Sequence, residues 1–496
     1  MPYGCDRSRY KNFAKRRKKL GKSAHSIHPP QPLFSVIPPH PRRFSLGLLS
    51  ATMLVVGNTI GVGIFTTSGV MAEQLPSPGL MLLVWVLGGV LSLAGALAWA
   101  ELAAAFPFAG GEYIYLREAF GPFWGFLCGW AAFVASFSGS IAVLAIALAD
   151  YVVGVLPSAL VSAPPLRFSS WGLSVPLGWN QLLGILLVWV FSLLNYRGLH
   201  LGSWTQNLLS LSKLAAITVL VIAGFCWGKG SWAHFSPLFP WSETSGVVSA
   251  AGLALIPVMF TYSGWNAASY IASEVRHPEK TLPRSLVLGT VITIGVYLTL
   301  NVLYLYASPV VVLRGVVRVG ELTAGALFGP TATWGISFLI ALSIASAFNV
   351  IILTGSRIYF AMATDGVFFS RAAELHPRFH TPGNALLLQA AWTSLLILSG
   401  TFEQLLTYAT IIIVSVSALT VSAVFALRRC RTDLARPYHV WGYPWLPALY
   451  VVGAVGIFVN ALWEQPAECL LGVGLCAAGA PAYLWWRRVD SPKRGA

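Results

Sequence analysis

The sequence contains few charged residues. Asp, Glu, Lys and Arg together make up 10% of its 496 residues, whereas soluble domains have roughly 25%. Hydrophobic residues account for 56%. This shortage of charge excludes a water-soluble globular protein. Apolar runs long enough to cross about 30 Å of hydrocarbon, roughly 20 residues each, recur along the chain. We count about twelve, at 46–73, 79–106, 121–155, 182–196, 208–227, 247–273, 286–307, 331–361, 385–399, 402–426, 446–463 and 469–486.

Motifs for nucleotide or metal chemistry are also missing. The sequence has no Walker-type phosphate loop, and its six cysteines and its isolated histidines show no metal-ligand or catalytic-triad spacing. We therefore expect neither an enzyme nor a cofactor or metal. Residues 1–44 are basic and rich in proline, without the apolar stretch of a signal peptide. They are predicted to be a disordered cytoplasmic tail that sets topology or contacts lipid headgroups, in preference to a specific partner site.

The formal net charge of +15 raises the question of nucleic-acid binding, but the positions of the basic residues argue against it. With an even number of spans, both termini lie on one side of the membrane. The opposite side receives only Arg167, Lys229, Arg314 and Arg318, and Lys213 falls inside a span. All other Lys and Arg residues lie on the terminal side, and because basic residues stay cytoplasmic, we expect both termini in the cytoplasm. The expected location is the cell (inner) membrane. The asymmetry explains the net charge, so we expect no nucleic-acid partner.

Two spans are interrupted near the middle of the membrane by small or polar residues. The first span contains Gly57, Gly61 and Gly63, and the sixth contains the stretch 260–266, with Ser263 and Gly264 at its centre. Five spans separate the two starts, so the two segments enter from opposite sides, as in inverted-repeat transporters. Glycines at this spacing also occur where helices simply pack closely. Two matching breaks favour an all-α polytopic protein with a five-plus-five inverted repeat and broken helices 1 and 6. Its parts are a first repeat at 45–228, a second at 245–428, helices 11 and 12 at 429–488, and a cytoplasmic C-terminus at 489–496.

Unwinding a helix in hydrocarbon exposes backbone groups and is tolerated only where a cavity, water or ligand satisfies them. The half-helix that begins near Ile64 would direct its N–H groups toward an anion, and Gly61 and Gly63 would not block approach. The half-helix that ends near Ser263 would direct carbonyls from about Phe260 onward toward a cation. Two such sites at one depth fit the carboxylate and ammonium groups of an amino acid.

Further stretches in the same order resemble a known family. They are 101–102 with 107–113, 274–280 with 283–284, 356–357 with 365–366, and 436–438 with 442–444. At these residues and at both breaks, the chain resembles the amino acid, polyamine and organocation (APC) transporter superfamily. The resemblance is closest to its branch of bacterial amino acid permeases and L-type amino acid exchangers.

The resemblance implies that spans one and six move between outward-open and inward-open states. It places Thr59, Val62 and Gly63 on the carboxylate side, and Phe260 and Ser263 on the ammonium side, with Phe260 also a gate. Val62 stands where relatives often carry Ser, and Ser263 where many carry Gly. With their neighbours in the two breaks, the expected substrate-binding residues are Thr59, Ile60, Gly61, Val62, Gly63, Phe260, Tyr262, Ser263, Gly264 and Asn266.

Three ionisable residues have alternative roles. Lys213 sits where sodium-coupled relatives of the same fold hold a cation, so its ammonium either pins span one against span eight or carries a proton. Glu101 and Glu274 either relay protons or hold short cytoplasmic contacts. The predicted function is sodium-independent transport of an amino acid substrate, neutral rather than cationic, by proton symport or amino acid exchange. The alternative is a sensor that binds without transporting, and any accessory subunit is left open.

Overall fold

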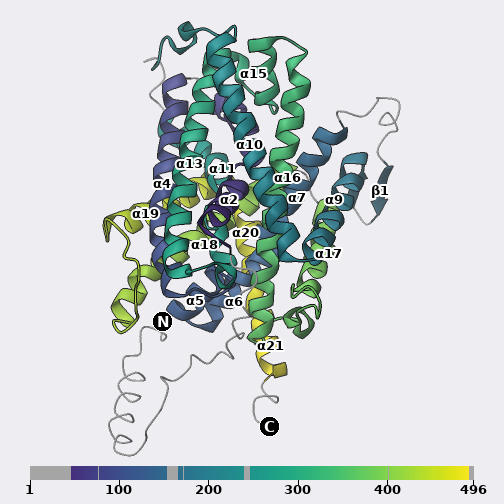
Figure 1. The fold of residues 1–496 in the computed structure, drawn as a ribbon, viewed down its shortest axis with the longest axis vertical. Helices are drawn as coiled ribbons and strands as arrows, with labels where there is room; N and C mark the ends of the chain where they lie inside the picture. The colour runs from purple at the N-terminus through teal and green to yellow at the C-terminus, as the bar shows by residue number, and fades with distance from the viewer. Residues whose placement is uncertain are drawn as a thin grey trace, which may run out of the picture.

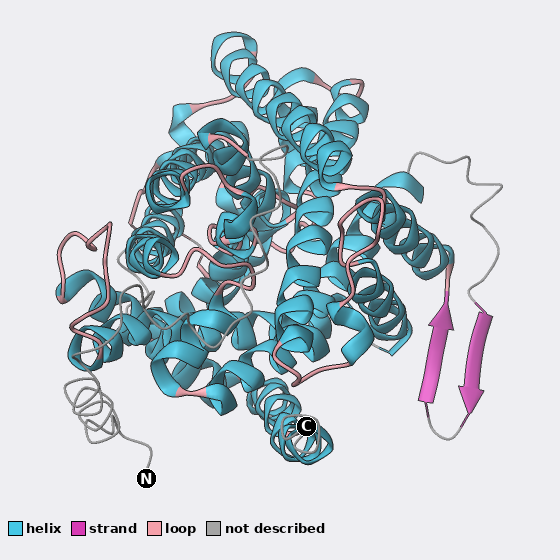
Figure 2. Cartoon of the chain, turned by 60° about the horizontal axis from the view of Figure 1, so that its bottom comes forward, coloured by secondary structure: helices cyan, strands magenta, loops and turns pink. Residues whose placement is uncertain are grey.

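The computed structural model describes residues 46–490 apart from gaps at 76, 154–165, 171–172, 240–245 and 400–401, so the predicted tail at 1–44 lies outside it. The described chain is helical except for one antiparallel hairpin, which the sequence did not predict, formed by β1 (Leu166–Ser170) and β2 (Leu173–Leu177). Figure 2 shows these strands at the edge of the helical bundle. The longer helices are α2 (Leu48–Thr59), α3 (Gly63–Gln74), α4 (Pro78–Ala105), α5 (Glu112–Phe120), α6 (Pro122–Ala131), α7 (Phe137–Val153), α9 (Trp179–Tyr196), α10 (Leu199–Trp227), α11 (Val247–Tyr262), α13 (Pro278–Ala307), α15 (Val319–Phe328), α16 (Ala332–Thr364), α17 (Gly383–Ser399), α18 (Phe402–Cys430), α19 (Trp445–Glu464), α20 (Pro466–Ala477) and α21 (Gly479–Asp490).

Helix starts follow local chemistry. The helices α4, α6, α13 and α20 each begin with a proline in the first turn, where the missing N–H has no intrahelical partner to lose. Ser77 also caps α4, since its hydroxyl accepts a hydrogen bond from the Leu80 amide at 3.4 Å. These residues mark in the sequence where the four helices begin.

Within the described residues, ten helical segments are long and apolar enough to cross a membrane, and α11, α15 and α17 are shorter apolar helices. The outward faces of these helices carry exposed apolar side chains: Leu83 on α4 is 55% exposed and Leu186 on α9 is 57% exposed. Contiguous apolar surface of this kind is stable in lipid but not in water. The chain is therefore a polytopic integral membrane protein.

The first broken segment lies at the centre of the bundle. Figure 1 shows α2 between α10, α13 and α16, and residue contacts join α2 to each of these three helices. In the same view α5, α6 and α21 lie at one end of the bundle and α15 at the other. We refer to the first of these as the α5 end.

Candidate functional site

The first span breaks where the glycines predict it. The helix α2 ends at Thr59 and α3 begins at Gly63, so residues 60–62 form a non-helical bridge. Within the bridge the Gly61 amide donates to the Thr59 carbonyl at 3.0 Å. Among the described residues, the amides of Gly63 and Ile64 donate to no acceptor outside their own helix. These two N–H groups form the positive end of α3.

Lys213 satisfies carbonyl groups that this break releases. Its buried ammonium donates to the Gly57 carbonyl at 2.8 Å and to the Ile60 carbonyl at 2.5 Å. The Ser343 hydroxyl on α16 donates to the same Ile60 carbonyl at 3.1 Å. Lys213 thus holds the first break to α10, and Ser343 holds the same Ile60 carbonyl to α16. The ammonium lies behind α2 and does not line the substrate cavity described below.

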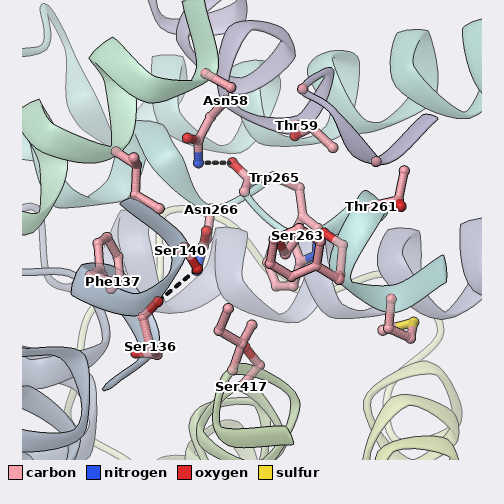
Figure 3. A pocket seen from close by; sticks show the side chains of 18 of the residues that line it. Asn58, Thr59, Ser136, Phe137, Ser140, Thr261, Ser263, Trp265, Asn266 and Ser417 are labelled. Carbon is pink, nitrogen blue, oxygen red and sulfur yellow. Dashed lines mark hydrogen bonds between the residues drawn. The ribbon is translucent and has the colours of Figure 1, made fainter. Parts of the chain in front are cut away.

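The sixth span breaks after Tyr262, the last residue of α11, and resumes as the short helix α12 (Ala267–Tyr270). Gly264 lies between them with φ of +102°, a conformation that disfavours any other residue. A Cβ atom at Gly264 would also lie 2.5 Å from the Asn58 amide nitrogen. That amide donates to the Gly264 carbonyl at 3.3 Å (Figure 3). The glycine therefore permits both the turn and the close approach of the first break.

A single tyrosine on α13 spans the two breaks. The buried Tyr297 hydroxyl lies 2.5 Å from the Thr59 carbonyl and 2.8 Å from the Thr261 carbonyl, and donates toward both. Close to it, a Cβ atom at Gly63 would lie 2.3 Å from the Thr261 hydroxyl. Tyr297 thus joins the ends of α2 and α11, and the start of α3 packs directly against the Thr261 side chain.

The two breaks line one cavity (Figure 3). Of the ten expected substrate-binding residues, eight line it: Thr59, Gly61, Val62, Gly63, Phe260, Ser263, Gly264 and Asn266. The other two lie behind it. Ile60 is fully buried and turns its carbonyl toward Lys213, and the Tyr262 hydroxyl donates to the Trp85 carbonyl at 3.2 Å.

Several lining residues were not expected from the sequence. Ser136 and Phe137 come from a π-helical turn, η1 (Ala132–Ser136), and from the start of α7, and Ser140 lies one turn further along. Such turns are frequent at functional sites. The polar run at 136–140 within an apolar span was the signal that could have found them. Ser417 on α18 carried no comparable signal.

Glu112, the first residue of α5, is the only Asp, Glu, Lys, Arg or His among the described residues that line the cavity. Its side chain is buried, and burial raises the pKa of this carboxyl to about 7. Hydrogen bonds with Tyr270 and Cys128 oppose that rise only in part. An acid placed in this way can exchange a proton near neutral pH.

The two predicted proton-relay candidates lie away from the cavity. Glu101, at the α5 end of α4, accepts hydrogen bonds from the Arg428 guanidinium at 2.9 and 2.5 Å and from the Val440 amide at 2.7 Å. Glu274 pairs with Arg357 at 3.4 Å. These contacts favour the structural alternative for both acids.

Comparisons with known proteins identify the family of this chain. The family model described as Amino acid permease matches residues 46–467. The serine/threonine exchanger SteT of Bacillus subtilis (strain 168) is 29% identical over 451 residues, which cover 88% of this chain and 95% of the relative. The human large neutral amino acids transporter small subunit 2 is 30% identical over 453 residues (89% and 81%), and the mouse Asc-type amino acid transporter 1 is 31% identical over 456 residues (89% and 81%). The resemblance drawn from the motifs is confirmed: the chain belongs to the amino acid permease family, whose members are membrane transporters and not enzymes.

Proposed function

We propose that this protein is a secondary transporter that moves neutral amino acids across the cell membrane by alternating access. One observation carries the proposal. Two helix breaks with opposite partial charges face one cavity, the positive end of α3 at Gly63 and the negative end of α11 at Tyr262. A substrate carboxylate would bind at Gly61 and Gly63, and its ammonium group beside Phe260 and Ser263.

The helix count supports an inverted repeat. In this proposal α11 and α17 join the ten long segments of the described chain to give the twelve spans that the repeat requires, and the 10-residue α15, at the end of the bundle opposite α5, belongs to a connection (Figure 1). In this proposal residues 45–228 and 245–428 form the two five-helix repeats, and residues 429–488 lie outside them. The positive-inside rule supports a cytoplasmic position for the α5 end, and in this proposal both termini lie on the same side.

Backbone groups would recognise the part shared by all amino acids, so the remaining lining residues would read the side chain. They are apolar or uncharged apart from Glu112, which suits a neutral substrate. Two relatives are named for serine and threonine exchange and for large neutral amino acids, which supports the same class.

Lys213 supports independence from sodium. Its ammonium already donates to two carbonyls at the first break, and a sodium ion needs such oxygens as ligands. Of its two predicted roles, these two hydrogen bonds favour the structural pin.

The test is uptake of labelled neutral amino acids by proteoliposomes that contain the purified full-length protein. We expect uptake or exchange that is unchanged when potassium or choline replaces sodium. Strict dependence on sodium would overturn the role of Lys213. Binding that stabilises the protein without any flux or exchange would overturn transport and favour the sensor alternative.

A further inference from the structure

Glu112 connects the cavity to the second broken segment. The Asn266 side-chain amide, at the start of α12, donates to the Tyr270 hydroxyl at 2.9 Å. The Tyr270 hydroxyl in turn hydrogen-bonds with the Glu112 carboxyl. The backbone is also joined here, since the Gly110 amide donates to the Tyr270 carbonyl at 3.2 Å. A movement of α12 would therefore move the surroundings of this carboxyl.

The helix that begins with Glu112 also closes the α5 end of the bundle. The Tyr113 hydroxyl donates to the Asp365 carboxylate at 2.5 Å, and the Arg117 guanidinium donates to the same carboxylate. Asp365 caps the C-terminus of α16. The short helix α5 thus bears a cavity acid at its first residue and an ion pair to α16 one turn later.

No basic side chain faces Glu112 among the described residues that interact with it. The titratable groups around the carboxyl are the thiol of Cys128 on α6 and the phenols of Tyr115, Tyr270, Tyr359 and Tyr450 on α5, α12, α16 and α19. The guanidinium of Arg428 on α18 is paired with Glu101, and Asp365 on α16 with Tyr113 and Arg117. In this closed, buried arrangement the neutral carboxylic acid is the favoured form.

We propose that Glu112 is the site at which a proton binds and is released during transport. The carboxyl holds its proton while α5 and α12 close the cavity. When these helices separate at the α5 end and water enters, the O–H bond breaks and the proton passes to that water, leaving a hydrated carboxylate. Reprotonation of the carboxylate favours closure. This inference rests on the proposed transport function and names its coupling site.

The pH dependence has a definite sign. Because burial raises the pKa of Glu112 to about 7, the closed state is protonated below that pH and loses the proton above it. Between about pH 6 and pH 8 the protonated fraction falls from roughly nine-tenths to roughly one-tenth. Closure, and coupled uptake with it, should weaken over the same interval.

The experiment compares the wild-type protein with Glu112→Gln, Glu112→Asp and the matched control Glu279→Gln in proteoliposomes, with a mixture of labelled neutral amino acids as the probe. Glu279 is an exposed acid outside the cavity, next to His277. We expect an inward proton gradient to drive several-fold accumulation by the wild type and the control, and weaker accumulation by Glu112→Asp, which keeps a carboxyl on a side chain shorter by one methylene. Glu112→Gln should accumulate nothing above equilibrium, and any exchange that it retains should no longer vary with pH.

Gradient-driven accumulation by Glu112→Gln would overturn the proposal, as would wild-type exchange that ignores the gradient. Absence of both flux and exchange in the wild type would instead overturn the transport function. If Glu112→Gln does not fold, infrared difference spectra of the wild type decide the matter. A protonated-carboxyl band that disappears with a midpoint near pH 7 supports Glu112, and its absence overturns the assignment.

Discussion

The Tyr297 hydroxyl offers the sharpest test of how the two breaks are held together. Substituting Tyr297→Phe removes one oxygen and leaves the ring, which is packed against Trp85 and Tyr262. One O–H can serve only one carbonyl at a time, so we count a single lost hydrogen bond. The Thr59 carbonyl keeps the Gly61 amide as a donor, so the Thr261 carbonyl is the one left without a partner, and a buried carbonyl in that state costs about 1–3 kcal/mol. We therefore expect the free energy of unfolding to fall by about that amount.

The same substitution should also change transport. If only the closed arrangement brings Thr59 and Thr261 onto one hydroxyl, the equilibrium between states shifts by roughly 5-fold to 150-fold toward the open ones. Because fewer molecules then occupy the closed state, the apparent affinity for substrate, measured by uptake in proteoliposomes, should fall.

A matched control lies two turns along the same helix. Tyr304 is also fully buried on α13, but its hydroxyl has no hydrogen-bond partner among the described residues. We expect Tyr304→Phe to be neutral or stabilising, because it removes a polar group that burial leaves unsatisfied. Equal effects of the two substitutions on thermal stability would refute the reasoning, since ring packing alone would then explain both.

Three further substitutions test other contacts. Gly63→Ala should abolish uptake in a folded protein, since its methyl group would lie 2.3 Å from the Thr261 hydroxyl, whereas Gly335→Ala, with open space around it, should transport normally in the same assay. Lys213→Met should stop transport with or without sodium, because the Gly57 carbonyl loses its donor; restoration of flux by sodium would contradict this. Glu101→Gln should lower the free energy of unfolding by about 1–3 kcal/mol, because it removes the ion pairs with Arg428 and Arg436, and should leave the pH profile of uptake unaltered; an altered profile would show that Glu101 takes part in proton transfer.

The sequence predicted the fold well where one physical constraint dominates. Hydrocarbon thickness fixes span length, and glycine clusters in an apolar run can be tolerated only at a close contact or a break, so the interruptions at 60–62 and 263–266 could be located from composition. The π-helical turn at 132–136 and the hairpin at 166–177 could not. They arise from packing and from an extended connection, and neither has a period that an apolar pattern reveals.

The prediction of the site was correct for the residues whose position follows from the two breaks. Residues in the breaks line the cavity because the chain itself bends there, yet two of them are turned away from it. Ile60 lies in the bridge of three residues and directs its carbonyl to Lys213, and Tyr262, at the end of α11, directs its hydroxyl to the Trp85 carbonyl. Glu112 was not predicted as a site residue because it belongs to a connection between spans. It reaches the cavity because the segment just before α5 approaches α12, where the Gly110 amide donates to the Tyr270 carbonyl.

The distribution of partners at the two breaks sets limits on substrate recognition. Most of the carbonyls that the breaks release already accept hydrogen bonds: Gly57 and Ile60 from Lys213, Thr59 from the Gly61 amide, Thr261 from Tyr297, Phe260 from Ser263, and Gly264 from Asn58. In the described part of the chain, the amides of Gly63 and Ile64 have no such external partner. Two backbone amides are therefore available to donate to the carboxylate of a substrate, whereas its ammonium group must share carbonyl acceptors with donors of the protein. Among amino acid analogues, loss of the carboxylate should consequently weaken binding more than methylation of the ammonium group, and the reverse order in a thermal-shift comparison would show that the carbonyl side dominates recognition.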